Sequence, residues 1–211
     1  MKFTLIKLAA ACAALLWAFA VTADDAPRIG YVRPLVGTDG FGNVYPGAQV
    51  PFGGIQISPD TDDDYYDAAS GYKYAHKTLM GFSLNHLSGT GIPDLGDFLF
   101  MPGVGEIKLE PGTHDDPDAG YRSRYSHDEE WCSPAYYGVN LTDYGVKAEM
   151  TAAQRSGILR FTFPEGEQSR IQIDLARRVG GTAERQYIEV VDKHTIAGWM
   201  KCPPATGGWG N

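Results

Sequence analysis

The side chains best suited to chemistry lie in residues 86–97. This stretch holds one imidazole, two hydroxyls and two carboxylates, separated by glycines: His86, Ser88, Thr90, Asp94 and Asp97. Glycine lets the backbone adopt positive φ or approach a ligand closely, and loops carry polar chemistry when a rigid scaffold holds both ends. The stretch therefore indicates a binding loop. A hydrogen-bonded turn, with Asp94 and Asp97 capping backbone N–H groups, is the more ordinary interpretation of the same residue types.

Apolar runs flank this loop on both sides and must position it. Residues 78–87 have strand character, and Phe98-Leu99-Phe100-Met101 follows the loop directly. Alternation of apolar and polar residues predicts further strands at residues 55–58, 137–141, 146–150, 159–163, 171–175, 187–190 and 194–200. Because no amphipathic helix of useful length interrupts them, the sequence beyond residue 103 predicts consecutive hairpins in an all-β antiparallel sandwich.

A second group of candidate binding residues precedes the loop. Tyr65, Tyr66, Tyr72 and Tyr74 lie close to Asp67. They combine flat apolar faces with hydrogen-bonding ends, as sugar rings require, although ordinary interfaces use the same residues. The adjacent Asp62-Asp63-Asp64 lacks the spaced ligands and the glutamate of an EF-hand, so a solvated acidic turn is favoured over a cation site.

Net charge and cysteine spacing exclude several classes of partner. The 211 residues carry a formal charge of −8, which argues against nucleic acid and anionic lipid, because both are bound through lysine and arginine. A neutral ligand such as a sugar is compatible with this charge. Two separate buried thiols at Cys132 and Cys202 are favoured over a disulfide, and no Cys/His spacing suggests zinc.

Residues 1–23 are typical of a secretory signal peptide. Lys2 and Lys7 are the only charges, residues 8–21 are apolar, and Val21-Thr22-Ala23 supplies the small-x-small cleavage pattern. The apolar run is too short for a membrane span, which needs about 20 residues. We expect cleavage after Ala23, a secreted or periplasmic product, and one β-sandwich domain over residues 24–211. Because residues 196–201 read as a strand that no closing element follows, we expect that domain to be truncated at its C-terminal end.

Short motifs are spread, in one order, over nearly all of residues 28–200. They are Val36-Gly37-Thr38-Asp39-Gly40, Tyr45-Pro46-Gly47-Ala48, Pro51-Phe52-Gly53, Gln56-Ile57-Ser58-Pro59-Asp60-Thr61, Ser70-Gly71-Tyr72, Gly81-Phe82-Ser83, His86-Leu87-Ser88-Gly89-Thr90-Gly91, Gly96-Asp97, Arg124-Tyr125-Ser126-His127-Asp128-Glu129-Glu130, Tyr136-Tyr137 and Ala148-Glu149-Met150-Thr151-Ala152. Each is weak alone, but the ordered set resembles the N-terminal domain of the glycoside hydrolase family 92 enzymes. The resemblance implies a galactose-mutarotase-like β-sandwich packed against a larger helical (α/α)6 domain.

The family resemblance also implies an activity and a division of labour. Members are secreted, calcium-dependent, exo-acting α-mannosidases that invert the anomeric centre, and their active site lies in the cleft between the two domains. The acid, the base and the Ca²⁺ ligands come mainly from the helical domain, whose motifs this chain lacks. We therefore expect the chain to supply no catalytic residue and no metal ligand, and to be inactive alone on mannose-containing glycans.

The sandwich of family members forms one wall of the sugar site. The resemblance, together with the loop chemistry above, gives these candidate substrate-binding residues: Tyr66, Asp67, Tyr72, His86, Ser88, Thr90 and Asp97. Members often carry Trp-Asp-Trp where this chain has Tyr66 and Ala68, and the lost ring predicts a weaker or different linkage preference. Ser88, Thr90 and Asp97 can equally support the cleft from beneath. Residues 131–135 also depart from the family, which commonly has Pro-Gly before the paired tyrosines.

Two other functions remain open from the sequence. A free-standing carbohydrate-binding module would fold alone and bind mannose without catalysis. A structural extracellular β-protein would be a stable monomer that binds no sugar. A sandwich that buries one face on a partner domain would instead expose an apolar patch when isolated, and would aggregate.

Overall fold

The computed structural model describes residues 28–62, 68–89 and 91–202. The chain divides into two units between residues 31 and 32, and the 3-10 helix η1 (Arg28–Tyr31) is the described part of the first. All that follows concerns the second unit. The predicted signal peptide and the candidate residues Tyr66, Asp67 and Thr90 lie outside the described residues.

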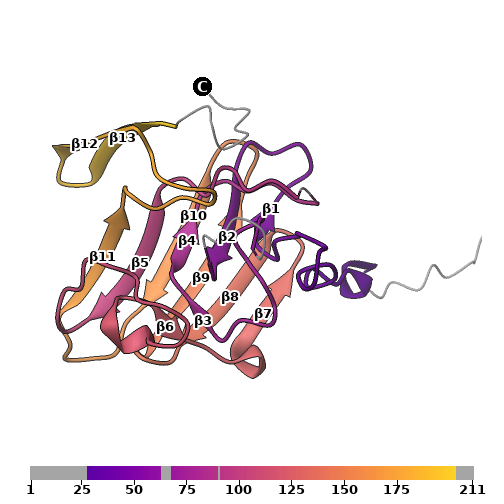
Figure 1. Cartoon of the computed structure of the whole chain (residues 1–211), viewed down its shortest axis with the longest axis horizontal. Coiled ribbons are helices and arrows are strands. Elements are labelled where there is room, and N and C mark those ends of the chain that lie inside the picture. Colours follow the sequence, from indigo (N-terminus) through magenta and orange to yellow (C-terminus); the bar gives the residue numbers. More distant parts are fainter. Residues whose placement is uncertain (1–27, 63–67, 90, 203–211) are drawn as a thin grey trace, which may run out of the picture. The chain divides into compact units, whose positions relative to one another are not determined.

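Two antiparallel sheets carry the buried core of this unit (Figure 1). The first has the order β1-β2-β4-β5-β11, formed by β1 (Ala48–Gln49), β2 (Gln56–Asp60), β4 (Gly81–Ser83), β5 (Leu99–Val104) and β11 (Ser169–Asp174). The second has the order β10-β9-β8-β7, formed by β7 (Glu130–Ser133), β8 (Tyr136–Leu141), β9 (Val146–Ala152) and β10 (Gly157–Thr162). Strand β9 lies against β1, β2 and β5, so the sheets pack face to face. The predicted all-β sandwich is confirmed.

Shorter elements surround the two sheets. They are the pair β3 (Thr78–Leu79) and β6 (Ser123–Arg124), the hairpin β12 (Arg185–Asp192) and β13 (Thr195–Lys201), and the 3-10 helices η2 (Pro117–Ala119) and η3 (His127–Glu129). Ser126 caps η3 by accepting the N–H of Asp128. Within the described part of the chain, no helix has the length and apolar character needed to cross a membrane.

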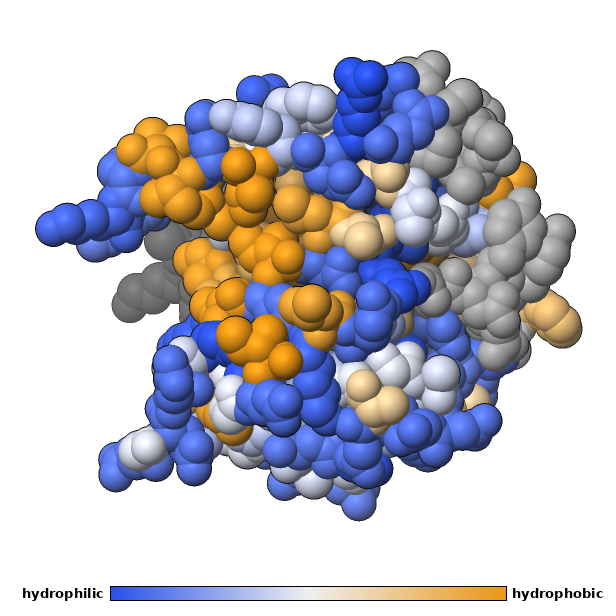
Figure 2. Space-filling view, turned by 60° about the vertical axis from the view of Figure 1, so that its left-hand side comes forward, coloured by the Kyte–Doolittle hydropathy of each residue, from blue (hydrophilic) through white to orange (hydrophobic). Residues whose placement is uncertain are grey.

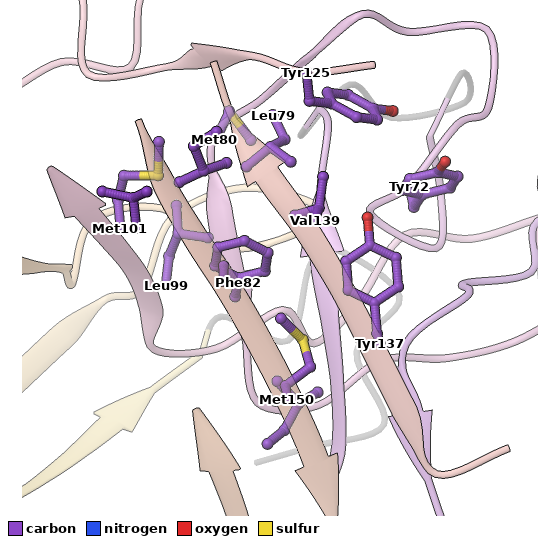
Figure 3. Close-up of a cluster of buried hydrophobic side chains, with 14 of the residues drawn as sticks. Tyr72, Leu79, Met80, Phe82, Leu99, Met101, Tyr125, Tyr137, Val139 and Met150 are labelled. Carbon is purple, nitrogen blue, oxygen red and sulfur yellow. The ribbon is translucent and has the colours of Figure 1, made fainter. Parts of the chain in front are cut away.

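The core forms because alternate residues of facing strands are apolar. Tyr137, Val139 and Leu141 of β8 pair with Met150, Ala148 and Val146 of β9, and all six are buried. Side chains directly opposite each other across a ladder share one face, so these pairs form a continuous apolar layer. Phe82 of β4 packs onto this layer from the other sheet, as Figure 3 shows.

Two local predictions need correction. The expected strand over residues 78–87 breaks at Met80, because β3 pairs with β6 whereas β4, which begins at Gly81, pairs with β2 and β5. Gly81 has φ +155°, and a Cβ there would lie 2.7 Å from Phe100 O, so only glycine suits this crossing. The expected hairpin between β10 and β11 is also wrong, since β11 crosses to pair with β5. The turn at residues 164–167 reverses the chain, but the strand that follows it does not pair with the strand before it.

Both cysteines of the described residues are free thiols, as predicted. Cys132 of β7 and Cys202 are half-buried and not bonded to each other. Burial raises the pKa of Cys132 to about 11, with the carboxylate of Glu130 contributing in the same direction.

The core can be tested at Phe82, whose side chain is fully buried. We expect Phe82→Ala to lower the free energy of unfolding by about 3–5 kcal/mol, because the cavity it leaves cannot fully collapse. Phe41→Ala is the matched control: Phe41 is 94% exposed, so its loss should change stability by less than about 0.5 kcal/mol. Urea unfolding followed by tryptophan fluorescence measures both, and equal losses would contradict this description of the core.

A carboxylate on the second sheet provides a pH-dependent test. Glu149 of β9 accepts hydrogen bonds from Arg160 Nη2 at 2.7 Å and from the Tyr136 hydroxyl at 2.9 Å. These bonds, that of Arg160 first, lower the pKa of Glu149 to about 2. Folding lowers the pKa of this carboxyl group from about 4.3, its value in the unfolded chain. Its ionised form therefore stabilises the fold fully above about pH 4.3, and this stabilisation is lost as the pH falls towards the pKa of the folded state.

Glu149→Gln should therefore lower Tm at pH 6, and the difference from the parent chain should shrink between about pH 4.3 and pH 2. Thermal unfolding followed by circular dichroism across this range measures the difference. A difference that stays constant down to pH 2 would show that the ionised carboxylate contributes nothing.

Candidate functional site

The loop singled out by the sequence is an extended hairpin between β4 and β5. His86 and Leu95 form an antiparallel bridge, and the N–H of Gly96 donates to Asn85 O at 2.8 Å. Nearer the sheet, the N–H of Leu84 donates to Asp97 O at 3.2 Å. We call residues 84–97 the motif loop. Its two arms are thus held by backbone pairing, as the buried strands on either side predicted.

The two carboxylates of the motif loop share one arginine. Arg178 Nη2 lies 2.6 Å from Asp94 Oδ1, and Arg178 Nε lies 3.0 Å from Asp97 Oδ1. Asn85 completes the arrangement, since its Nδ2 donates to Asp97 Oδ2 at 3.0 Å and its Oδ1 accepts the Asp97 N–H at 2.8 Å. The side chains of Arg178 and Asp94 are 1% and 3% exposed. Asp97 therefore supports the loop from beneath, one of the two roles that the sequence left open.

His86 belongs to the same loop, and its side chain is buried. Its Nδ1 lies 2.8 Å from Gln56 O, and because a carbonyl only accepts, this nitrogen carries a hydrogen. Its Nε2 lies 2.8 Å from Asp60 Oδ1, while the Ser83 hydroxyl donates to Asp60 Oδ2 at 2.5 Å. His86 thus ties the motif loop to β2 through buried contacts with Gln56 and Asp60.

Tyr72 belongs to a third buried polar centre. Its hydroxyl donates to Glu130 Oε1 at 2.9 Å, and the Tyr137 hydroxyl donates to the same oxygen at 2.6 Å. His127 Nδ1 lies 2.7 Å from Glu130 Oε2. Burial, followed by nearby charged and phenolic groups including Glu130, raises the pKa of Tyr137 well above its usual value, so the phenol stays a hydrogen-bond donor. Figure 3 shows Tyr72, Tyr125 and Tyr137 together at one end of the core cluster.

The exposed groups lie where three loops meet. The N–H of Gly89 donates to Asn43 O at 2.6 Å, and the N–H of Tyr74 donates to Thr38 O at 2.9 Å. We call residues 37–44, 73–75, 87–89 and 91–92 the rim. Ser88 and Phe41 are exposed on it, and Tyr74 stacks on His127 with ring centroids 3.8 Å apart. The rim thus offers a hydroxyl and aromatic surface above three rigid polar centres.

A cavity of about 470 Å³ opens beside residues 37–44 of the rim. Val44, Pro51 and Pro134 line it together with Tyr45 and Gln49, whose side chains are joined by a 2.6 Å hydrogen bond. Apolar walls with a few placed polar groups are the usual composition of small-molecule sites. Pro134 comes from residues 131–135, the segment for which the sequence predicted a departure from the family pattern.

The comparison with protein families decides what this arrangement belongs to. The family model "Glycosyl hydrolase family 92 N-terminal domain" matches residues 31–210. The chain belongs to this family. The resemblance inferred from the sequence motifs is thereby confirmed, and the rim, the motif loop and the three polar centres are features of a family 92 domain.

Solved family 92 structures share the fold of this domain. A GH92 α-mannosidase from Bacteroides thetaiotaomicron, solved alone and with mannoimidazole, has a TM-score of 0.80 and 67% sequence identity, over 82% of this chain and 23% of its own. A GH92 inverting mannosidase from the same organism has a TM-score of 0.58 and 28% identity, over 71% of this chain and 20% of its own. The family 92 domain described here thus spans about a quarter or less of these relatives.

A curated relative agrees with the family assignment. A protein of Arthroderma benhamiae, described as an uncharacterized secreted glycosidase, is 30% identical over 138 residues, which are 64% of this chain and 17% of that protein.

Sequence reasoning missed the residues that hold the site together. Arg178 lies more than 80 positions from both of its carboxylate partners, and no local pattern connects them. Glu130 was recognised as part of a motif but not as the acceptor for Tyr72. Phe41 lies in a glycine-rich stretch that indicated a loop but no role.

The contribution of Arg178 to stability can be tested against a second arginine that also binds two aspartates. Arg178→Met leaves two carboxylates without their cation, and should lower the free energy of unfolding by about 3–5 kcal/mol. Arg124 also bridges two aspartates, Asp118 and Asp143, but its side chain is 43% exposed, so Arg124→Met should cost less than about 1 kcal/mol. Urea midpoints of the two variants measure the difference, and similar losses would contradict the supporting role given to burial.

Proposed function

We propose that this chain forms one wall of the sugar cleft of a secreted α-mannosidase that hydrolyses terminal α-mannosides of glycans with inversion. The observation that carries the proposal is the 67% sequence identity with an α-mannosidase. The present chain covers 23% of the length of that enzyme. The family 92 domain supplies shape and contact through the rim. The proton-transfer groups come from another domain.

The chemistry of the motif loop supports this division. Inverting hydrolysis needs one carboxyl group to protonate the leaving oxygen and another, roughly 6.5–9.5 Å away, to activate water. Asp94 and Asp97 are the carboxylates of the loop, but both bind Arg178, and the second oxygen of Asp97 accepts from Asn85. Groups held in this way maintain the loop and are poorly placed to exchange protons with a substrate.

The described residues also do not fit the calcium site expected of the complete enzyme. Ca²⁺ takes six to eight oxygen ligands. Among the described residues, the one set of three candidate metal ligands contains two imidazoles, those of His76 and His114. We therefore propose that Ca²⁺, as in other family members, binds through the helical domain, and that no step on this chain involves it.

Exposed apolar side chains on and around β11, β12 and β13 support association with further polypeptide. Exposed apolar residues lie on β11, on β12 and β13, and before η2: Ile107, Leu109, Ile171, Tyr187, Ile188, Val190, Val191, Ile196 and Trp199. Figure 2, which brings the side of β11 to β13 forward, shows apolar side chains gathered on this side of the molecule. Extended apolar patches mark interaction surfaces. The chain alone is accordingly proposed to be inactive and prone to aggregation.

Secretion belongs to the same proposal. Residues 1–23 have the pattern of a signal peptide, and the relative from Arthroderma benhamiae is described as secreted.

The activity can be tested by complementation. The purified chain alone should release no mannose from an aryl α-mannoside above the buffer rate. Addition of the part of the Bacteroides thetaiotaomicron α-mannosidase that lies outside its matched domain should restore release, and a chelator should abolish it. Proton NMR of the first sugar released should show the β-anomer.

Mannose release by the chain alone would overturn the proposed division of labour. Sugar binding by the chain alone, with no release in any mixture, would instead indicate a carbohydrate-binding module. Phe41→Ala is the matched rim variant: it should lower the restored rate while leaving the urea midpoint unchanged.

A further inference from the structure

Three side chains from separate segments meet on a surface that the proposed mannosidase role does not use. Asp62 follows β2, His76 precedes β3, and His114 lies before η2. One ligand atom from each lies within 4.8 Å of the other two. Two imidazoles and a carboxylate form a donor set that binds Zn²⁺ and related transition metal ions.

The hydrogen bonds of His76 prepare its ring for a metal. Thr61 Oγ1 accepts the N–H of Lys73 at 2.9 Å, and its own hydrogen is directed at Gly71 O, 3.5 Å away. The same hydroxyl oxygen lies 3.0 Å from His76 Nδ1 and is able to accept a hydrogen from it. In the tautomer with the hydrogen on Nδ1, Nε2 carries the lone pair that a metal needs. A hydrogen-bonded second nitrogen is the usual way in which a metal-binding histidine is oriented.

His114 lies beside a second threonine, with Thr78 Oγ1 3.0 Å from its Nδ1. Its Nε2 lies 2.7 Å from Asp62 Oδ2 and, because a carboxylate only accepts, carries a hydrogen that a metal ion would have to displace. The ligands of a tetrahedral Zn²⁺ site are about 3.3 Å apart, given metal–ligand distances of about 2.0–2.1 Å. The pair would have to separate by about 0.6 Å to admit the ion. Both side chains can move, since they are 29% and 20% exposed.

The surroundings limit which metal ions suit the site. Arg122 Nη1 lies 3.3 Å from His114 Nδ1, and its positive charge opposes every cation, so an ion held here needs direct bonds to the imidazoles. A cavity of about 490 Å³, lined by Asp62, His114 and Arg122, opens beside the ligands and leaves room for a water molecule as a further ligand. A hard ion such as Ca²⁺ would meet too few oxygens here.

We propose that Asp62, His76 and His114 form a Zn²⁺ site, through one carboxylate oxygen and Nε2 of each histidine. The ion would join the ends of three segments, those that leave β2, enter β3 and precede η2. The site is separate from the calcium of the proposed enzyme and does not depend on the proposed mannosidase activity.

Calorimetry on the metal-stripped, tag-free chain tests the proposal directly. We expect one Zn²⁺ per chain, bound at micromolar concentration or below, with no competition from millimolar Ca²⁺. His76→Gln and His114→Gln should each weaken binding at least tenfold. His194→Gln is the matched control, because His194 is exposed in the turn between β12 and β13, and should leave binding unchanged. Zn²⁺ at a hundredfold excess over its Kd should raise Tm by about 5–10 °C.

A second measurement on the unmutated chain covers the case in which a variant fails to fold. Zn²⁺ should protect His76 and His114, but not His194, from acylation by diethyl pyrocarbonate, as mapped by mass spectrometry. Absence of binding, equal protection of all three histidines, or an affinity that both folded variants retain would each overturn the site.

Discussion

The buried guanidinium of Arg178 lies between two carboxylates of the motif loop, and the course of that loop depends on this charge. An isolated carboxylate is costly to remove from water, so Asp94 can lie beneath the surface only while its cation remains. The constraint reaches across the chain, because Arg178 follows β11 whereas the loop follows β4. The loop therefore acquires its shape only after distant parts of the polypeptide have come together.

The same principle recurs at the other two polar centres below the rim. Asp60 is held by His86 and Ser83, and Glu130 by two tyrosines and a histidine. Each places a satisfied carboxylate under a loop, where hydrogen bonds fix direction more closely than apolar packing does. In the proposed function, such rigid support reduces the conformational freedom that exposed side chains lose on binding a sugar. The polar groups beneath the surface thus hold the proposed binding surface in place.

Strand periodicity and ordered motifs were enough to predict the sandwich and the family, because both signals are local in the sequence. Partners were not predictable in the same way. The turn after β10 indicated a reversal, yet β11 joins β5 in the other sheet. Tyr72 and His86 were expected at a sugar because they are polar aromatics in the right motifs, but the structure places them under the rim, where Glu130 and Asp60 are their partners. Residues that pair over such distances in the chain form no local sequence pattern from which the pairing could be predicted.

The unpaired Cys132 has a chemical consequence for a protein proposed to leave the cell. Disulfide exchange requires a thiolate, and a pKa of about 11 leaves roughly one molecule in ten thousand ionised at neutral pH. Its sulfur should thus react slowly with oxidants and with other proteins, without any bond to Cys202. Burial beside a negative charge should therefore keep this thiol unreactive in the oxidising environment proposed for the domain. Other small secreted domains rely on disulfide cross-links there.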